Sequence, residues 1–180
     1  MEAIELLLHR HSCAKLAAPA PTGEALETIY HAGLKTPDHG GLKPWRFIEV
    51  SGAGMDRLAD IFAAAAQHAQ GDVDKAKAMP QRAPLIIIVI ASYVIHPKVP
   101  EMEQLLSAGC AVHAMQMAAL AQGFNGIWRT GPMSYDNTVN EMLGLTDSEQ
   151  IVGFLYLGTA QTGAPQKSPY QIDQFVSKIN

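Results

Sequence analysis

Few cysteines and few charges occur in this chain, and each shortage excludes a class of protein. The two cysteines among the 180 residues, Cys13 and Cys110, lie far apart and form no CxxC pair. A disulfide framework is therefore not indicated, and a cytoplasmic location is expected. Charged residues make up 17% of the chain and leave a formal net charge of -4. Because a general nucleic-acid binder usually carries a basic surface, we expect no nucleic-acid partner.

Long hydrophobic runs are also missing. Residues 1–8 contain two glutamates and no basic group, unlike the basic leader of a signal peptide. The apolar stretches are shorter than the roughly 18 residues that a membrane span requires. Hydrophobic residues nevertheless make up 48% of the chain, which is enough for one domain with its own core. We expect a single domain over residues 1–180 and no membrane partner.

Hydrophobic periodicity predicts helices that alternate with strands. The predicted helices span Ala3–His9, Thr22–Leu34, Met55–Gln70, Glu101–Gln122 and Ser134–Leu143, and the predicted strands span Trp45–Val50, Leu85–Ala91, Gly126–Arg129 and Ile151–Leu157. The polar segment from Gly71 to Arg82 is expected to be exposed. Strands separated by helices favour an α/β or α+β sheet that is covered by helices.

The helix predicted over Glu101–Gln122 is unusually apolar. Between Ala108 and Leu120, only His113 and Gln116 are strongly polar. A helix that is apolar on nearly every face must be buried on nearly every face. The sequence therefore predicts that this helix lies at the centre of the fold or in a subunit interface.

The first candidate site follows the N-terminal helix. Arg10, His11, Ser12 and Lys15 bring two fixed charges, a hydroxyl and a titratable ring within six positions. The planar guanidinium of arginine suits a phosphate, and serine adds another donor. The alternative is an ordinary basic loop, since cations also suit the C-terminal end of a helix dipole.

A second basic loop contains Lys35, His39 and Lys43 around Gly40-Gly41. Taken alone, this loop is typical of a solvated surface segment. No metal site is predicted from the histidines, because His9 and His11 have no obvious third ligand.

The third candidate is Trp128-Arg129-Thr130, at the end of a predicted strand. An unpaired charge is costly to bury, so Arg129 must face solvent, a carboxylate or an anionic ligand. The chain has no GxGxxG, GxxxxGK[ST] or GxSxG motif, which removes the main support for dinucleotide, P-loop and hydrolase assignments.

Eight segments in this order resemble the nitroreductase family of FMN-dependent oxidoreductases, in particular its small, YdjA-like bacterial subgroup. The segments are Leu8–Ser12, Ala32–His39, Leu42–Phe47, Ser107–Ala111, Met115–Ala119, Ala121–Phe124, Gly126–Arg129 and Ile151–Thr159. The resemblance covers nearly the whole chain. It implies an α+β fold with a mixed sheet flanked by helices, built as an intertwined homodimer with FMN at the interface.

The resemblance also implies roles for particular residues. Arg10, His11 and Ser12 would reach the FMN phosphate and ribityl chain, Lys35 and His39 would contact the flavin, Trp128, Arg129 and Thr130 would line the same site, and Ala118, Ala119, Leu120, Ala121, Gln122 and Gly123 would lie near the nicotinamide donor. The long helix would form the central interface, and the tail from about Gly163 would pack on the partner.

The implied reaction passes electrons from NADH or NADPH through the flavin to a nitroaromatic, quinone or similar acceptor. One shared site implies ping-pong kinetics, and no catalytic protein residue is required. The chain departs from the family pattern at Ala14, Asp38, Gly41 and Lys43, so weaker flavin binding, or binding by backbone and lysine groups, is the alternative there. Two other functions stay open: a flavin-storing protein without turnover, and a non-redox protein whose basic loop binds another anion.

Overall fold

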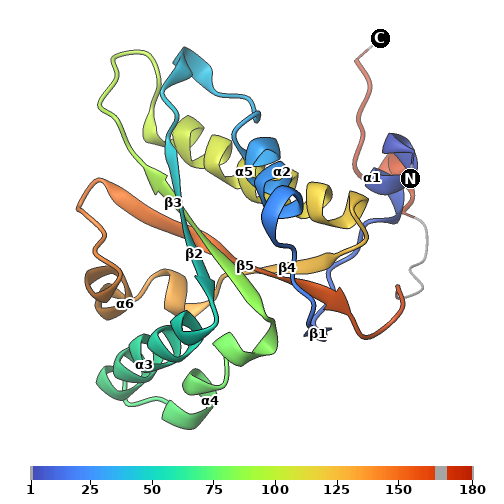
Figure 1. Ribbon diagram of the computed structural model, residues 1–180. Helices are drawn as coiled ribbons and strands as arrows, with labels where there is room; N and C mark the ends of the chain where they lie inside the picture. Colours follow the sequence, from blue (N-terminus) through green and yellow to red (C-terminus); the bar gives the residue numbers. More distant parts are fainter. Residues whose placement is uncertain (1, 165–169, 180) are drawn as a thin grey trace.

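Within the described residues, 2–164 and 170–179, five strands of the computed structural model form one sheet between two layers of helices (Figure 1). The strands are β1 (Leu16–Ala17), β2 (Trp45–Ser51), β3 (Leu85–Ser92), β4 (Asn125–Arg129) and β5 (Glu149–Ala160). β2 pairs with β3, β3 pairs with β5, and β5 also pairs with β1 and β4.

All helices of the described residues except α1 divide between the two faces of the sheet, and α1 lies beside α5 (Figure 1). The helices are α1 (Ala3–His9), α2 (Gly23–Gly33), α3 (Ala53–His68), α4 (Val73–Lys77), α5 (Glu101–Ala121) and α6 (Asn137–Met142), with 3-10 turns η1 (His39–Gly41), η2 (Pro80–Arg82), η3 (Pro132–Ser134) and η4 (Ile172–Gln174). α2 and α5 pack on one face, whereas α3, α4 and α6 pack on the other. No helix among the described residues is long and apolar enough to cross a membrane.

The predicted central strand is confirmed, because β3 is buried at every residue from Leu85 to Ala91. Alternate side chains point to opposite faces of a strand. Ile86 and Ile88 accordingly join the core beneath α3, and Ile87 and Val89 join the core beneath α5. A strand buried on both faces needs a continuous apolar run, which this segment has.

Three details of the predicted fold need correction. Every strand pairing among the described residues is antiparallel, whereas a mixed sheet was expected. The segment from α3 to η2 leaves the end of β2 and returns to that same end, so β3 runs in the opposite direction to β2. The segment Gly71–Arg82 is partly buried, since Ala76 packs in the core. Asp136, rather than Ser134, caps α6 by accepting a hydrogen bond from the Val139 N–H at 3.2 Å.

An ion pair joins three parts of the sheet at the start of β5. Arg46 donates to both carboxylate oxygens of Glu149 at 2.5 and 2.9 Å. The same carboxylate accepts from the Ser92 hydroxyl at 2.9 Å and from the Thr146 N–H at 3.1 Å. The Arg46 hydrogen bond is the main reason that the pKa of Glu149 falls from 4.5 to about 2. Four accepted hydrogen bonds thus fasten β2, β3 and β5 together.

Replacing Glu149 with Gln should lower the free energy of unfolding by about 1–3 kcal/mol at pH 7, because Arg46 loses its charged partner. A lowered folded-state pKa stabilises the protein above the unfolded value of 4.5, and this contribution disappears as the pH falls to about 2. Urea denaturation from pH 7 to pH 3 should therefore show the two proteins converging. Glu141→Gln, at an exposed position, is the control and should unfold like wild type at either pH. If the difference in unfolding free energy between wild type and Glu149→Gln stays constant with pH, the charge-based explanation is wrong.

Candidate functional site

The free edge of β4 lies opposite β5 and receives the N-terminal loop. The Gly126 carbonyl accepts from the Cys13 N–H at 3.1 Å and from Gln116 Nε2 at 2.8 Å. This carbonyl therefore points away from β5. Because backbone groups alternate along an antiparallel strand, the N–H and C=O of Trp128 also face the free edge. The edge thus presents backbone donors and acceptors beside the loop that contains Arg10.

The first candidate residues are held together at this edge. Arg10 Nη2 donates to the Ser12 hydroxyl at 3.1 Å, and Asn125 Nδ2 donates to His11 Nε2 at 3.1 Å. Arg10 Nε is buried and has no hydrogen-bond partner among the residues described. A buried guanidinium donor without a partner is costly, so the loop is suited to an added anionic acceptor. Cys13 is buried and packs behind it.

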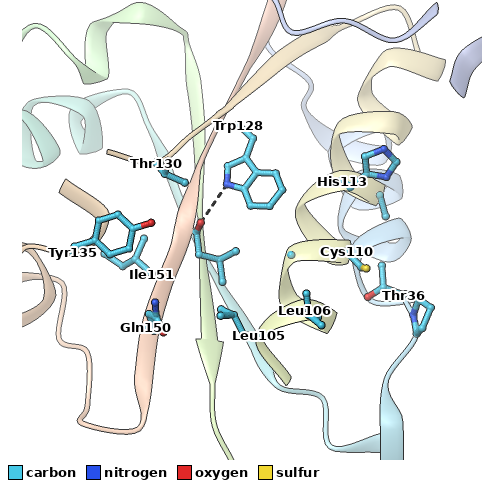
Figure 2. Close-up of a pocket in the computed structure, with 14 residues that line it drawn as sticks. Thr36, Leu105, Leu106, Cys110, His113, Trp128, Thr130, Tyr135, Gln150 and Ile151 are labelled. Atoms are coloured by element: carbon cyan, nitrogen blue, oxygen red, sulfur yellow. Dashed lines mark hydrogen bonds between the residues drawn. The ribbon is translucent and has the colours of Figure 1, made fainter. Parts of the chain in front are cut away.

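Trp128 forms one wall of a cavity of about 660 Å³ between α5 and the sheet (Figure 2). Its indole N–H donates to the Val152 carbonyl at 3.2 Å, and its outer edge rests against Gly109 of α5. The cavity is lined by Thr36, Pro37, Leu105, Leu106, Gly109, Cys110, His113, Ala114, Trp128, Thr130, Tyr135, Gln150, Ile151 and Val152. The volume and mostly apolar lining suit a flat ring system.

The position of the Trp128 indole depends on a β-bulge in β5. The pairing register between β3 and β5 shifts between Val89 and Ile90, which leaves Val152 as an extra residue. Gly153 follows it, and a Cβ there would overlap with Trp128 Nε1 and lie 2.8 Å from the Arg129 carbonyl. Glycine is therefore required for the indole to lie against the strand.

The loop with Lys35 and His39 is fastened to α5. Asp38 accepts the N–H groups of Leu42 at 3.1 Å and Lys43 at 2.7 Å. Two residues of α5 hold the loop on either side of Asp38. The Ser107 hydroxyl donates to the Pro37 carbonyl at 2.6 Å, and Glu103 Oε2 lies 2.5 Å from His39 Nδ1. The departure from the family pattern at Asp38 thus has a structural role, since its carboxylate holds the turn that follows it.

Within one chain, the structure brings together only part of the predicted site. Trp128 and Thr130 line the cavity, and Thr36 and Pro37 reach it from the loop between Lys35 and His39, which do not line it. The residues that remain outside its lining are Arg10, His11, Ser12, Lys35, His39, Arg129, Ala118, Ala119, Leu120, Ala121, Gln122 and Gly123. Their predicted contacts with flavin and nicotinamide stay predictions.

The positions of Ala119, Gln122 and Arg129 outside the cavity have clear physical reasons. Ala119 is fully buried in the core beneath α5, and Gln122 Nε2 donates to backbone carbonyls of Ala25 and Ala118 at 3.2 and 3.0 Å. The Gln122 side chain is therefore tied to α2 and α5, while Ala121, Gln122 and Gly123 themselves stay exposed. Arg129 follows Trp128 along a strand and consequently points to the opposite face of the sheet, where its guanidinium lies 5.7 Å from the centre of the Tyr156 ring.

Cys110, Tyr135 and Gln150 also line the cavity but carry no signal in the sequence. Cys110 sits inside an apolar helical run, and Gln150 directly precedes the strand predicted over Ile151–Leu157. The packing of α5 against β5, with Tyr135 added from the turn after η3, places them around the same space.

Comparison with known proteins gives one consistent family. A model of the nitroreductase family matches residues 7–159. The chain is 50% identical over 167 residues to "Putative NAD(P)H nitroreductase YdjA" of Escherichia coli K12, covering 91% of both proteins, and 36% identical over 173 residues to "Putative NAD(P)H nitroreductase" of Haemophilus influenzae, covering 93% of both.

Solved structures share the fold. The nitroreductase-like family protein of Bacillus cereus superposes with a TM-score of 0.85 at 19% identity, covering 99% of this chain and 96% of that one. A nitroreductase of Desulfovibrio desulfuricans, solved in complex with FMN, superposes with a TM-score of 0.78 at 20% identity, covering 98% of this chain and 96% of that one. The expected α+β architecture is therefore confirmed.

Replacing Gly153 with Ala should displace the Trp128 indole, because the added methyl group overlaps with it. We expect a loss of about 1–3 kcal/mol in unfolding free energy and a shifted tryptophan fluorescence maximum. Gly109→Ala is the matched control, since its Cβ would lie 3.6 Å from the same indole, an ordinary contact. Equal melting temperatures and emission spectra for the two variants would show that the bulge does not seat the indole.

Proposed function

The chain belongs to the nitroreductase family, and we propose that it is an FMN-dependent oxidoreductase. In this proposal it takes electrons from NADH or NADPH and passes them to a nitroaromatic, quinone or similar acceptor. The names of the relatives in E. coli and H. influenzae support NAD(P)H as the donor. The FMN complex of the D. desulfuricans protein supports the cofactor.

The observation that carries the proposal is the free edge of β4. Backbone groups of Trp128 face this edge, the unpartnered Arg10 Nε lies in the loop beside it, and the apolar cavity adjoins its far end. FMN combines a flat ring with hydrogen-bonding edges and a phosphate at the end of a polar chain. The residues present fit such a molecule, with the ring toward Trp128 and the phosphate toward Arg10.

A second copy of the chain would complete the site. α5 presents Met102 and Leu106 to solvent at 63% and 61% exposure, and α1 presents Ile4 and Leu8 at 67% and 76%. Apolar patches of this kind mark interaction surfaces. We propose a homodimer in which Lys35 and His39 of one chain approach the cavity of the other. The exposed side chains of Ile172, Phe175 and Val176, in and directly after η4, suit the same role for the C-terminal segment.

The residues of the chain then have distinct tasks. Arg10 would offset the phosphate charge, and Ser12 would orient the guanidinium. Trp128 would hold the ring against one wall and exclude water from it, while backbone N–H groups at the β4 edge would stabilise negative charge on the reduced ring. Bound FMN would supply the chemistry by accepting a hydride from the nicotinamide and delivering electrons to the acceptor.

Ping-pong kinetics follow if donor and acceptor use the same cavity in turn. The lining contains no nucleophile that the reaction needs, and no catalytic residue is assigned. Ala118–Gly123 would contribute to the nicotinamide site through its exposed residues Ala121, Gln122 and Gly123, since Ala119 is buried in the core.

The visible spectrum of the purified protein tests cofactor and reaction together. We expect flavin absorption bands in the oxidised protein, which anaerobic NADH or NADPH should bleach and which an added quinone should restore. A yellow protein that neither nucleotide reduces would favour the flavin-storage alternative. A colourless protein that takes up no added FMN would exclude the proposed function.

Replacing Arg10 with Ala should weaken FMN binding by about tenfold or more, because a charge-assisted contact with the phosphate is lost. The dissociation constant can be measured by quenching of FMN fluorescence. Riboflavin, which lacks the phosphate, should bind both proteins equally. If the R10A protein binds FMN as tightly as wild type, the phosphate lies elsewhere.

A further inference from the structure

A second pocket, of about 380 Å³, lies on the face of the sheet opposite the Trp128 cavity. It is lined by Phe62, Met79, Arg82, Ile127, Trp128, Arg129, Thr130, Gly131, Pro132, Met133, Phe154 and Tyr156. α3, η2, β4, η3 and β5 all contribute residues. No Asp or Glu is among them, although two arginines are.

The two guanidinium groups have no acidic partner in the part of the chain that the structure describes. Neither Arg82 nor Arg129 forms an ion pair there, and Arg129 Nε is buried without a hydrogen bond. Burial raises the pKa of Tyr156, whereas the charges of Arg82 and Arg129 oppose this rise. Both charges therefore act on the same hydroxyl at the pocket wall.

This arrangement is costly unless something negative enters it. Two cations that face one partly enclosed space repel each other, and a buried donor without a partner loses its hydration. The cation–π contact of Arg129 with the Tyr156 ring, at 5.7 Å from the ring centre, offsets part of that cost. Both arginines line the same pocket, so an anion that enters it would meet the two positive charges together.

We propose that this pocket binds an oxyanion carried on an apolar body, with Arg82 and Arg129 holding the oxyanion. The walls formed by Phe62, Ile127 and Met133 suit the apolar part, and two arginines suit a carboxylate or a similar flat oxyanion. Arg82 is thereby assigned to ligand binding, although it comes from a segment whose sequence indicates only a polar surface.

The cavity and the pocket share Trp128 and Thr130. Because the phosphate of FMN is assigned to Arg10, the oxyanion would belong to an acidic electron acceptor beside the cofactor. This choice of source rests on the proposed function. The proposal that the pocket binds an anion rests on its two arginines and does not depend on the proposed function.

Benzoate is a suitable probe, with benzyl alcohol as its neutral counterpart. Met79 and Met133 line the pocket, so methyl-¹³C methionine NMR reports binding at this place. Benzoate should shift these two resonances in saturable fashion, whereas benzyl alcohol should bind at least tenfold more weakly. Shifts that persist in FMN-saturated protein would support an acceptor as the source of the oxyanion. Shifts confined to FMN-free protein would show that bound FMN occupies this pocket, which would contradict both the acceptor as the source and the placement of the phosphate at Arg10.

Variants test the role of Arg82 directly. Arg82→Gln should weaken benzoate binding at least tenfold, and Arg82→Lys should keep part of the affinity because it keeps the charge. Arg57→Gln removes an exposed arginine of α3 outside the pocket and should bind benzoate like wild type; thermal melting checks that each variant is folded. Unshifted Met79 and Met133 resonances, or equal benzoate affinity of folded Arg82→Gln and wild type, would overturn the proposal. Protein that binds benzoate here but takes up no FMN would refute the proposed function alone.

Discussion

β5 is the strand on which the rest of the structure depends, because β1, β3 and β4 all pair with it. Its bulge at Val152 and Gly153 seats the Trp128 indole, and its first residue, Glu149, fastens β2 and β3. Its Tyr156 forms a wall of the arginine pocket. Core packing and ligand-sized spaces are therefore set by a single strand, and a change in its register would alter both faces of the sheet.

The step from Trp128 to Arg129 divides the chemistry of β4 between two environments. Trp128 lies opposite Leu155 in the core layer beneath α5, and Arg129 lies opposite Phe154 in the layer beneath α3. Neighbouring residues of a strand cannot share a face. A ring site and a cationic site consequently adjoin the same strand end, where Trp128 and Thr130 border both.

The sequence predicts the elements better than the site. An unbroken β-branched run identifies β3, and the periodic apolar helices identify α2 and α3. By contrast, the opposite directions of Trp128 and Arg129 are not among the predictions, which assign both residues to one site. The encounter of Arg82 with Arg129 joins segments 47 positions apart (129 minus 82), and the capping of the Leu42 and Lys43 N–H groups by Asp38 depends on a turn geometry that residue types alone do not specify.

The apolar character of α5 links the single chain to the proposed homodimer. Ala108, Val112 and Met115 are fully buried against the sheet, yet Met102 and Leu106 on the other side of the helix remain exposed. A helix that packed only against the sheet could carry charged side chains on its solvent-facing side. The cavity beside Trp128 opens along this same side, with Leu106 and Cys110 in its wall. The surface that favours association is therefore also a wall of the candidate site, so dimer formation and ligand binding should stabilise each other.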